Sequence, residues 1–240
     1  LFRKLYLAEA KKNGKSRLFI KENHLYRHLP FLMSAFPECR VVYLVRDPRD
    51  MALSWKRARE LRGDVARASR IWLEDQQEGL RVLGQLRTVN RIARVRYEEL
   101  VDQPTATLTT LCSDLDISFE PGMLDFHLAD GVKKHAHATQ SWSNVSQPVM
   151  SGNHGKWRNQ LSEDELTTIE WRCGKLMDIL GYDRALPEVN ESDGMAALQR
   201  ITPLERNTKA EYSEVSQEEQ DQRARAAAHR TALGNRPPRF

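Results

Sequence analysis

The run Arg40-Val-Val-Tyr-Leu-Val-Arg46-Asp-Pro limits the fold of this chain more than any other part of its sequence. Its middle is apolar and rich in β-branched residues, which is typical of a parallel strand covered on both faces. Asp47 and Pro48 follow at once, and they suit the N-cap and the first position of a helix. The run therefore predicts a buried strand that delivers Arg46 to the start of a helix.

The rest of the chain continues this alternation of strands and helices. Apolar runs predict further strands at Leu18–Ile20 and 92–97. Helical spacing of apolar residues predicts helices over 1–12, 24–36, 66–87, 104–115 and 162–180. Ser162 and Glu165 form a capping-box pattern at the start of the last helix, and Gly181 suits its end. These features predict an α/β fold with a mostly parallel sheet.

Charge and composition divide the chain in two. We assign residues 1–186 to one domain and residues 187–240 to a charged tail, flexible or helical, that we expect to be dispensable for the fold. The net charge of +4 suits a small phosphate-bearing ligand as well as a nucleic acid. No long Lys/Arg run favours a nucleic acid, so we predict no nucleic-acid partner. No apolar run approaches the roughly 20 residues that a membrane span needs.

The spacing of cysteines and histidines predicts neither a disulfide framework nor a metal site. There are three cysteines, an odd number, and Cys112 and Cys173 lie in apolar helical patterns that predict buried thiols. His24 and His28 share a helix face, but no third ligand accompanies them, so we predict no metal site.

The end of the strand at Arg46 predicts an anion site. Ligands of open α/β sheets bind outside the carboxyl ends of the strands, and a helix start presents free N–H groups there. The Arg46 guanidinium can donate two hydrogen bonds to one phosphate, and the Ser54 hydroxyl can add another. An ordinary surface Arg and helix Ser would fit the same pattern.

Residues 36–50, Phe-Pro-Glu-Cys-Arg-Val-Val-Tyr-Leu-Val-Arg-Asp-Pro-Arg-Asp, resemble a segment of the sulfotransferases that use 3′-phosphoadenosine 5′-phosphosulfate (PAPS), in the form common in bacterial members. In that family a Ser follows the Arg by eight positions. The resemblance implies that Arg46 and Ser54 hold the 3′-phosphate of PAPS, the co-substrate. It also implies a three-layer, P-loop-like sulfotransferase fold.

Two further motifs resemble the same family. Tyr97 in Val-Arg-Tyr-Glu-Glu-Leu matches a strand-end Tyr that contacts the adenine. Residues 152–157, Gly-Asn-His-Gly-Lys-Trp, match a Gly-x-x-Gly-x-Trp element, so Gly152, Gly155, Lys156 and Trp157 are implied to close over the 3′-phosphate. Some members have Arg-Lys before the first Gly. Here these residues are Met150 and Ser151, and Lys156 or Arg158 would supply the charge.

Transfer of a sulfonate needs a cation for the leaving oxygen and a base for the acceptor proton. By the resemblance, Lys21 is the predicted cation. His24 is the predicted base, with Glu22 or a residue upstream of Leu1 as alternatives.

The family's loop that holds the 5′-phosphosulfate precedes the Lys motif, and residues 1–20 lack it. We therefore expect an N-terminally incomplete chain. The predicted function is sulfonate transfer from PAPS to a hydroxyl or amine of a small-molecule, glycan or lipid acceptor. The alternative is a non-catalytic remnant that binds adenosine 3′,5′-bisphosphate or a protein partner. We expect a cytoplasmic protein, and no feature indicates an oligomeric state.

Overall fold

The computed structural model describes residues 2–21, 24–58, 61–87, 91–129, 132, 144–206 and 225. Its elements, in chain order, are α1 (Phe2–Lys12), η1 (Leu25–His28), α2 (Leu29–Ala35), β1 (Val41–Val45), α3 (Pro48–Arg57), α4 (Val65–Arg87), β2 (Ile92–Arg96), α5 (Tyr97–Asp102), α6 (Pro104–Asp114), η2 (Pro121–Leu128), η4 (Lys156–Asn159), α8 (Glu163–Leu180), α9 (Glu191–Ile201) and η5 (Thr202–Leu204). Elements labelled η are 3₁₀ helices.

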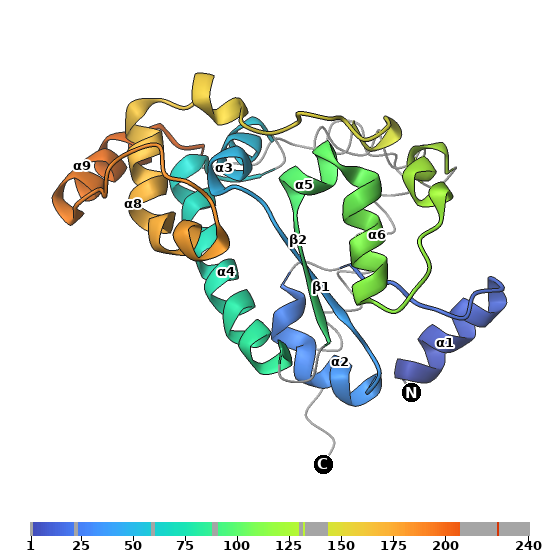
Figure 1. The fold of residues 1–240 in the computed structure, drawn as a ribbon. Coiled ribbons are helices and arrows are strands. Elements are labelled where there is room, and N and C mark those ends of the chain that lie inside the picture. The colour runs from blue at the N-terminus through green and yellow to red at the C-terminus, as the bar shows by residue number, and fades with distance from the viewer. Residues whose placement is uncertain are drawn as a thin grey trace, which may run out of the picture.

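Two parallel strands form the centre of the described fold (Figure 1). β1 pairs with β2 from Val41 opposite Ile92 to Val45 opposite Arg96. The carboxyl ends of both strands therefore lie at one edge, where α3 and α5 begin (Figure 1). This arrangement confirms the predicted α/β class and the predicted strand that ends before Arg46.

Helices lie on both sides of the strand pair (Figure 1). α4 contacts β2 on one side, and α6 contacts it on the other. α8 packs on α4, and α9 packs on α8. The main hydrophobic core joins β1, α3, α4 and α8, and its fully buried members include Val45, Ala52, Ile169 and Met177.

Local signals in the sequence set several helix ends as predicted. The Asp47 side chain accepts the N–H of Arg49 at the start of α3. At α8 both hydrogen bonds of the Ser162–Glu165 capping box are present, and Gly181 ends the helix with a φ of 80°. Cys112 and Cys173 are buried, as predicted. Burial raises the pKa of the Cys173 thiol, so it is uncharged at neutral pH.

The predicted strand at Leu18–Ile20 is wrong. This segment has no regular secondary structure, and the Phe19 side chain is 83% exposed. Strands persist when a neighbour satisfies their N–H and C=O groups, and the described sheet contains β1 and β2 alone. Apolar residues in a short run are therefore not sufficient to form a strand here.

The first part of the 187–240 segment packs on the domain, which differs from the predicted dispensable tail. α9 is helical, Ala197 and Ile201 are buried, and Ile201 belongs to the main core. Arg206 pairs with Asp64 and donates to backbone carbonyls at the end of α3. The low aromatic content of this segment predicts no core of its own, but two small or branched apolar side chains suffice for packing when α8 supplies the opposite face.

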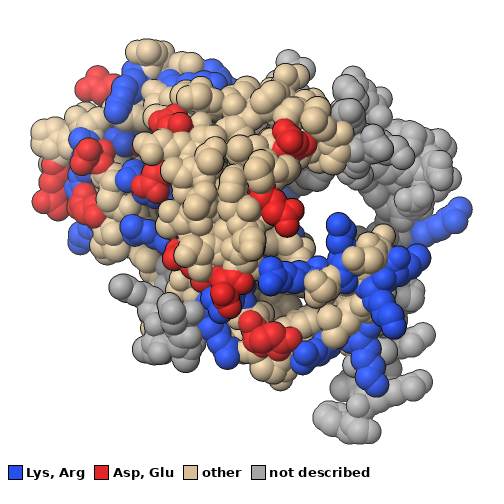
Figure 2. Space-filling model, turned by 45° about the vertical axis from the view of Figure 1, so that its right-hand side comes forward, with Lys and Arg blue, Asp and Glu red and all other residues tan. Residues whose placement is uncertain are grey.

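Basic side chains are concentrated near the N-terminus. Residues 2–21 contain seven Lys or Arg and one Glu, an excess larger than the net charge of the whole chain. In Figure 2, blue side chains gather at the lower right, and red and blue are interspersed over the left. Within the part of the chain that the structure describes, no helix has the length and apolar character needed to cross a bilayer.

Candidate functional site

Arg46 lies where β1 turns into α3. Its backbone carbonyl accepts a hydrogen bond from Trp72 Nε1 at 2.9 Å, which fixes the end of the strand against α4. Its Cζ lies 4.4 Å from the centre of the Tyr97 ring. Its Nε is buried and has no hydrogen-bond partner among the described residues. Arg46 is therefore held in place with donor capacity left over for a ligand.

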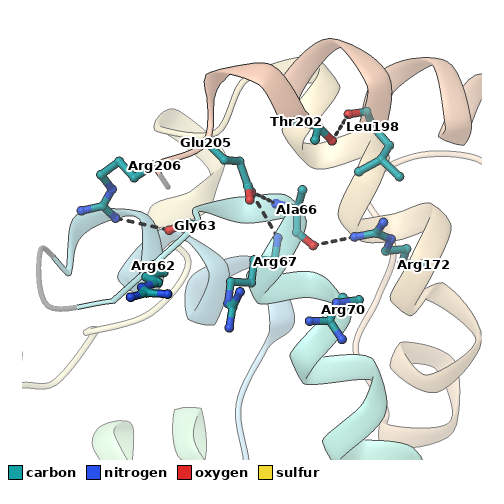
Figure 3. A pocket seen from close by; sticks show the side chains of 10 residues that line it. All are labelled: Arg62, Gly63, Ala66, Arg67, Arg70, Arg172, Leu198, Thr202, Glu205 and Arg206. Carbon is teal, nitrogen blue, oxygen red and sulfur yellow. Dashed lines mark hydrogen bonds between the residues drawn. The ribbon is translucent and has the colours of Figure 1, made fainter. Parts of the chain in front are cut away.

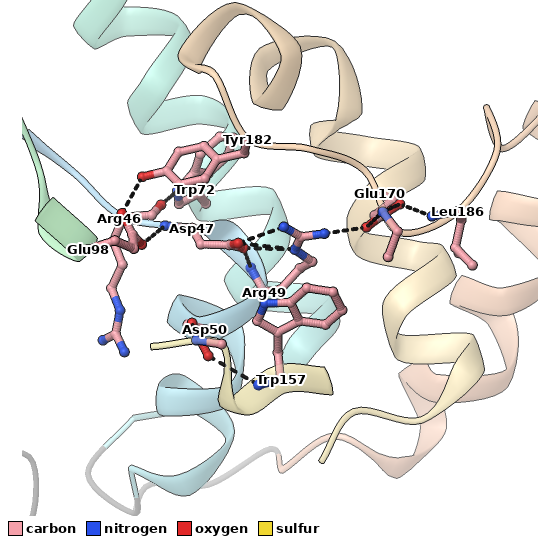
Figure 4. Close-up of polar contacts among 12 residues, drawn as sticks. Arg46, Asp47, Arg49, Asp50, Trp72, Glu98, Trp157, Glu170, Tyr182 and Leu186 are labelled. Carbon is pink, nitrogen blue, oxygen red and sulfur yellow. Dashed lines mark hydrogen bonds and ion pairs between the residues drawn. The ribbon is translucent and has the colours of Figure 1, made fainter. Parts of the chain in front are cut away.

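Glu98 ties the two strand ends together. Its Oε1 accepts the N–H of Asp47 at 2.9 Å, and its Oε2 accepts the hydroxyl of Tyr182 at 3.0 Å (Figure 4). Tyr97 precedes it at the start of α5, and the Tyr97 hydroxyl accepts from Asn153 Nδ2 at 2.8 Å. These contacts place Arg46 and Tyr97 side by side at the carboxyl edge of the sheet.

A glycine-containing loop, residues 152–157, reaches the same edge. Gly152 and Gly155 have φ values of 68° and 70°, in the left-handed region that glycine adopts without strain. The N–H of Gly155 and that of Trp157 both donate to the Asp50 carboxylate, which is 2% exposed. Asp50, one turn into α3, thereby holds the loop against the start of that helix.

The other end of the loop rests on Asp102. The N–H of Gly152 donates to Asp102 Oδ1 at 3.0 Å, and His154 Nε2 lies 2.7 Å from Oδ2. These contacts hold the pKa of the Asp102 carboxyl below its usual range, so it stays charged at neutral pH. Within the loop, Lys156 Nζ donates to Asn153 Oδ1 at 2.6 Å.

A buried ion network lies beneath the loop (Figure 4). Arg49 is 4% exposed and donates to Asp47 at 2.7 Å and to Glu170 of α8 at 2.8 Å. Its Cζ lies 3.9 Å from the centre of the buried Trp157 ring. One guanidinium thus faces two carboxylates, and backbone N–H groups also donate to both of them: that of Arg49 to Asp47, and those of Ala185 and Leu186 to Glu170. The network joins β1, α3 and α8, and every charged group in it has a partner.

A pocket of about 700 Å³ lies at this edge of the sheet. Its lining includes the basic residues Arg46, Arg57 and Lys156, the neutral polar residues Ser54 and Asn153, and the buried carboxylate of Asp50. The rest of the lining is largely apolar and comes from α5, α6, η2 and residues 144–150. The volume falls within the range of small-molecule sites, about 300–1,000 Å³. Such a lining suits a ligand that has an anionic group and an apolar, planar part.

Residues 2–121 match the family model described as the sulfotransferase family. This chain belongs to the sulfotransferase family. No curated protein matches it.

Two solved structures of sulfotransferase domains resemble the fold. The domain from the Synechococcus PCC 7002 olefin synthase has a TM-score of 0.54 and 22% identity, over 77% of this chain and 65% of that one. The domain from the curacin biosynthetic pathway has a TM-score of 0.50 and 23% identity, over 77% of this chain and 69% of that one. The chain thus spans about two thirds of their length, and at these identities the likeness concerns the fold.

Four residues predicted from the sulfotransferase motifs meet in the pocket. Arg46, Ser54, Tyr97 and Lys156 all line it, although they come from α3, α5, η4 and the end of β1. Ser54 is exposed on the second turn of α3 and belongs to the lining of the pocket. These four residues are up to 110 positions apart in the sequence. The parallel pairing of β1 with β2 and the hydrogen bonds of Asp50 to the loop bring them together.

Gly152, Gly155 and Trp157 lie beside the pocket and do not line it. The N–H groups of both glycines already donate to carboxylates, and Trp157 is 4% exposed beneath the loop. In this structure their contacts shape the loop that carries Asn153 and Lys156.

Lys21 and His24 are not among the residues that line the pocket. His24 has a left-handed backbone with φ of 59°, and its Nδ1 lies 3.0 Å from Asp75 Oδ1 of α4 and 3.1 Å from the Tyr26 hydroxyl. Lys21 is exposed. Glu22, the alternative base, lies outside the described residues.

Several polar residues that line the pocket were not predicted from the sequence, among them Asp50, Arg57 and Asn153. Asp50 and Arg57 had a usable signal, because each lies near Asp47 or Ser54 at helical spacing on the expected α3. Asn153 had none, since only the folded loop brings it to Tyr97. Across the described residues there is no group of three or more His, Cys, Asp or Glu side chains placed to hold a metal ion.

Proposed function

We propose that this sulfotransferase-family chain binds PAPS in the pocket at the carboxyl edge of its sheet and passes the sulfonate to a hydroxyl or amine of a small acceptor. The acceptor oxygen or nitrogen would attack sulfur, and the bond from sulfur to the 5′-phosphate oxygen would break. Adenosine 3′,5′-bisphosphate would leave, and the acceptor proton would pass to a base.

One observation carries the proposal: Arg46, Ser54 and Lys156 line one pocket, and most of the other residues that line it are apolar. The buried Arg46 Nε has no partner among the described residues, so a phosphate would satisfy it. Arg57, one turn after Ser54, adds a further positive charge. Tyr97 and the apolar side chains of residues 145–150 would pack against the adenine ring of the nucleotide.

Titration by calorimetry with adenosine 3′,5′-bisphosphate and with the 5′-monophosphate tests the binding half. Arg46→Ala should lose about 1.5–3 kcal/mol of binding free energy for the bisphosphate, the value of a hydrogen bond to a charged group. Ser54→Ala should lose less, because its hydroxyl is neutral. The affinity for the 5′-monophosphate should be the same in the Arg46→Ala variant and in the unmodified chain.

Arg94→Ala is the matched control, since Arg94 is exposed on β2 and does not line the pocket. It should leave both affinities unchanged. Equal losses for the two nucleotides in Arg46→Ala would contradict a role at the 3′-phosphate.

Nucleotide binding without transfer is the second candidate, and the position of Lys21 and His24 outside the pocket lining favours it. Their roles as leaving-group cation and base stay predictions. Transfer from labelled PAPS to phenols, alcohols and amines separates the candidates. If the chain transfers sulfonate, Lys21→Ala should lower kcat sharply with little change in donor affinity, and Lys15→Ala should not. Normal kcat in Lys21→Ala would remove Lys21 from the mechanism.

A further inference from the structure

A second cavity, of about 390 Å³, shares no lining residue with the proposed PAPS pocket and is lined by five arginines (Figure 3). They come from the loop before α4 (Arg62), from α4 itself (Arg67 and Arg70), from α8 (Arg172) and from the end of η5 (Arg206). None of these residues belongs to the motifs that resemble the sulfotransferases, so the family's donor site does not account for them.

Two of the charged side chains that line the cavity, Glu205 and Arg206, already have partners within the protein. Glu205, the one acidic residue among those lining it, accepts the N–H groups of Ala66 and Arg67 at the start of α4 (Figure 3). Arg206 forms an ion pair with Asp64 at 2.7 Å and donates to the carbonyl of Lys56 at 2.8 Å. These contacts build the wall of the cavity and leave its positive charge unbalanced.

The other four arginines carry that charge. Arg62 and Arg67 have no ion-pair partner among the described residues, and Arg70 pairs with Glu74 at the exposed surface. Arg172 donates to the Ala66 carbonyl and to Ser69 Oγ, which are both neutral. Burial lowers the pKa of Arg172, and the charge of Arg70 lowers it further. The charge of Glu205 opposes this effect, but five guanidinium groups share the cavity with that one carboxylate, so positive charge predominates there. A bound anion would reduce the repulsion among these like charges.

We propose that this cavity is a second anion site, which binds a small ligand bearing two or more phosphate or sulfate groups. A guanidinium matches the oxygens of either group with two parallel hydrogen bonds. The volume exceeds that of a single ion and lies within the range of small-molecule sites, about 300–1,000 Å³. Arg62 and Arg67 at the exposed rim would contact one group, and Arg172, deeper in the cavity, would contact the other.

Calorimetry of the full chain with inorganic pyrophosphate, and separately with inorganic sulfate, tests the site. Pyrophosphate should bind saturably and more tightly than sulfate. Arg62→Ala/Arg67→Ala should weaken pyrophosphate binding at least about tenfold, the effect of losing about 1.4 kcal/mol. Both side chains are exposed, so the fold should persist, and an unchanged thermal midpoint without ligand would verify this.

Two controls make the result decisive. Arg81→Ala/Arg94→Ala removes the same charge at exposed positions outside the cavity and should leave binding intact. Arg46→Ala, which disables the proposed PAPS pocket, should also leave it intact. The site is overturned if the unmodified chain shows no saturable binding, if both double variants lose affinity equally, or if Arg46→Ala abolishes binding. Failure of PAPS binding alone would not affect this result.

Discussion

At the scale of single residues, Asp50 organises the candidate site although it is almost inaccessible to a ligand. Its carboxylate accepts two backbone N–H groups from the glycine-containing loop, and so it sets where Asn153 and Lys156 stand relative to Arg46. Carboxylates that accept buried N–H groups form charge-assisted hydrogen bonds, which are stronger than neutral ones. The position of the polar groups in the pocket thus depends on Asp50, which holds the backbone of the loop through hydrogen bonds.

Asp50→Asn should loosen the loop, because the side-chain NH₂ of Asn is a donor. It cannot accept one of the two backbone N–H groups that donate to the Asp50 carboxylate. We expect a loss of about 1–3 kcal/mol, the cost of leaving a buried polar group unsatisfied. Amide hydrogen exchange measured by NMR should accelerate at Gly155 and Trp157, and affinity for adenosine 3′,5′-bisphosphate should fall with it.

Asp102→Asn is the comparison, since Asp102 holds the other end of the loop through Gly152 but is exposed. It should have the smaller effect on both measurements. Unaltered exchange at Gly155 in Asp50→Asn would show that the loop is held by something else.

At the scale of elements, the close approach of α8 and α9 depends on a glycine. A Cβ placed on Gly194 would lie 2.1 Å from Cγ of Trp171, far inside any tolerated contact. Trp171 itself is held by a hydrogen bond from its Nε1 to Glu191 at 3.1 Å. The indole therefore has little freedom to move away, and α9 can pack here only if residue 194 has no side chain.

Gly194→Ala should destabilise the chain by about 1–3 kcal/mol through overpacking, despite the higher helix propensity of Ala. Gly84→Ala, in α4, is the matched control, because no atom lies within 4 Å of its added Cβ. That substitution should stabilise by about 0.5–1 kcal/mol. Chemical denaturation of both variants measures the difference. Equal shifts in the same direction would mean that α9 is not packed on Trp171.

At the scale of the whole molecule, the helices after residue 162 complete the core that positions the site. Glu170 of α8 forms an ion pair with Arg49, and the Tyr182 hydroxyl donates to Glu98, so both contacts reach the strand ends from the C-terminal part of the chain. α9 and Arg206 then cover α8 and the end of α3. Truncation should therefore have an effect that depends strongly on where the chain is cut.

Ending the chain after residue 186 should lower the thermal midpoint by several degrees or more, because it exposes the surface that Ala197 and Ile201 cover and leaves Asp64 without Arg206. Ending it after residue 206 keeps all of these contacts and should change the midpoint little. Thermal unfolding of the two truncated chains beside the full one measures both. Similar midpoints for all three would restore the boundary at residue 186 that the sequence indicated.

The local pattern of the sequence was enough to determine the strand before Arg46, the cap at Asp47, the capping box at Ser162 and the end of α8 at Gly181. Each of these depends on residues within about one helical turn, and their preferences act over that distance. The motifs also identified Arg46, Ser54, Tyr97 and Lys156, which the fold brings into one pocket.

Contacts between distant segments decided the rest. Leu18–Ile20 is as apolar as a strand, yet no neighbouring strand pairs with it among the described residues. Asn153 reaches Tyr97, and Arg206 reaches α3, only because the packed helices bring these segments together. The five arginines of the second cavity are spread over residues 62–206, so no local sequence pattern predicts that they cluster. Burial and pairing across such distances depend on tertiary packing, which local preferences do not encode.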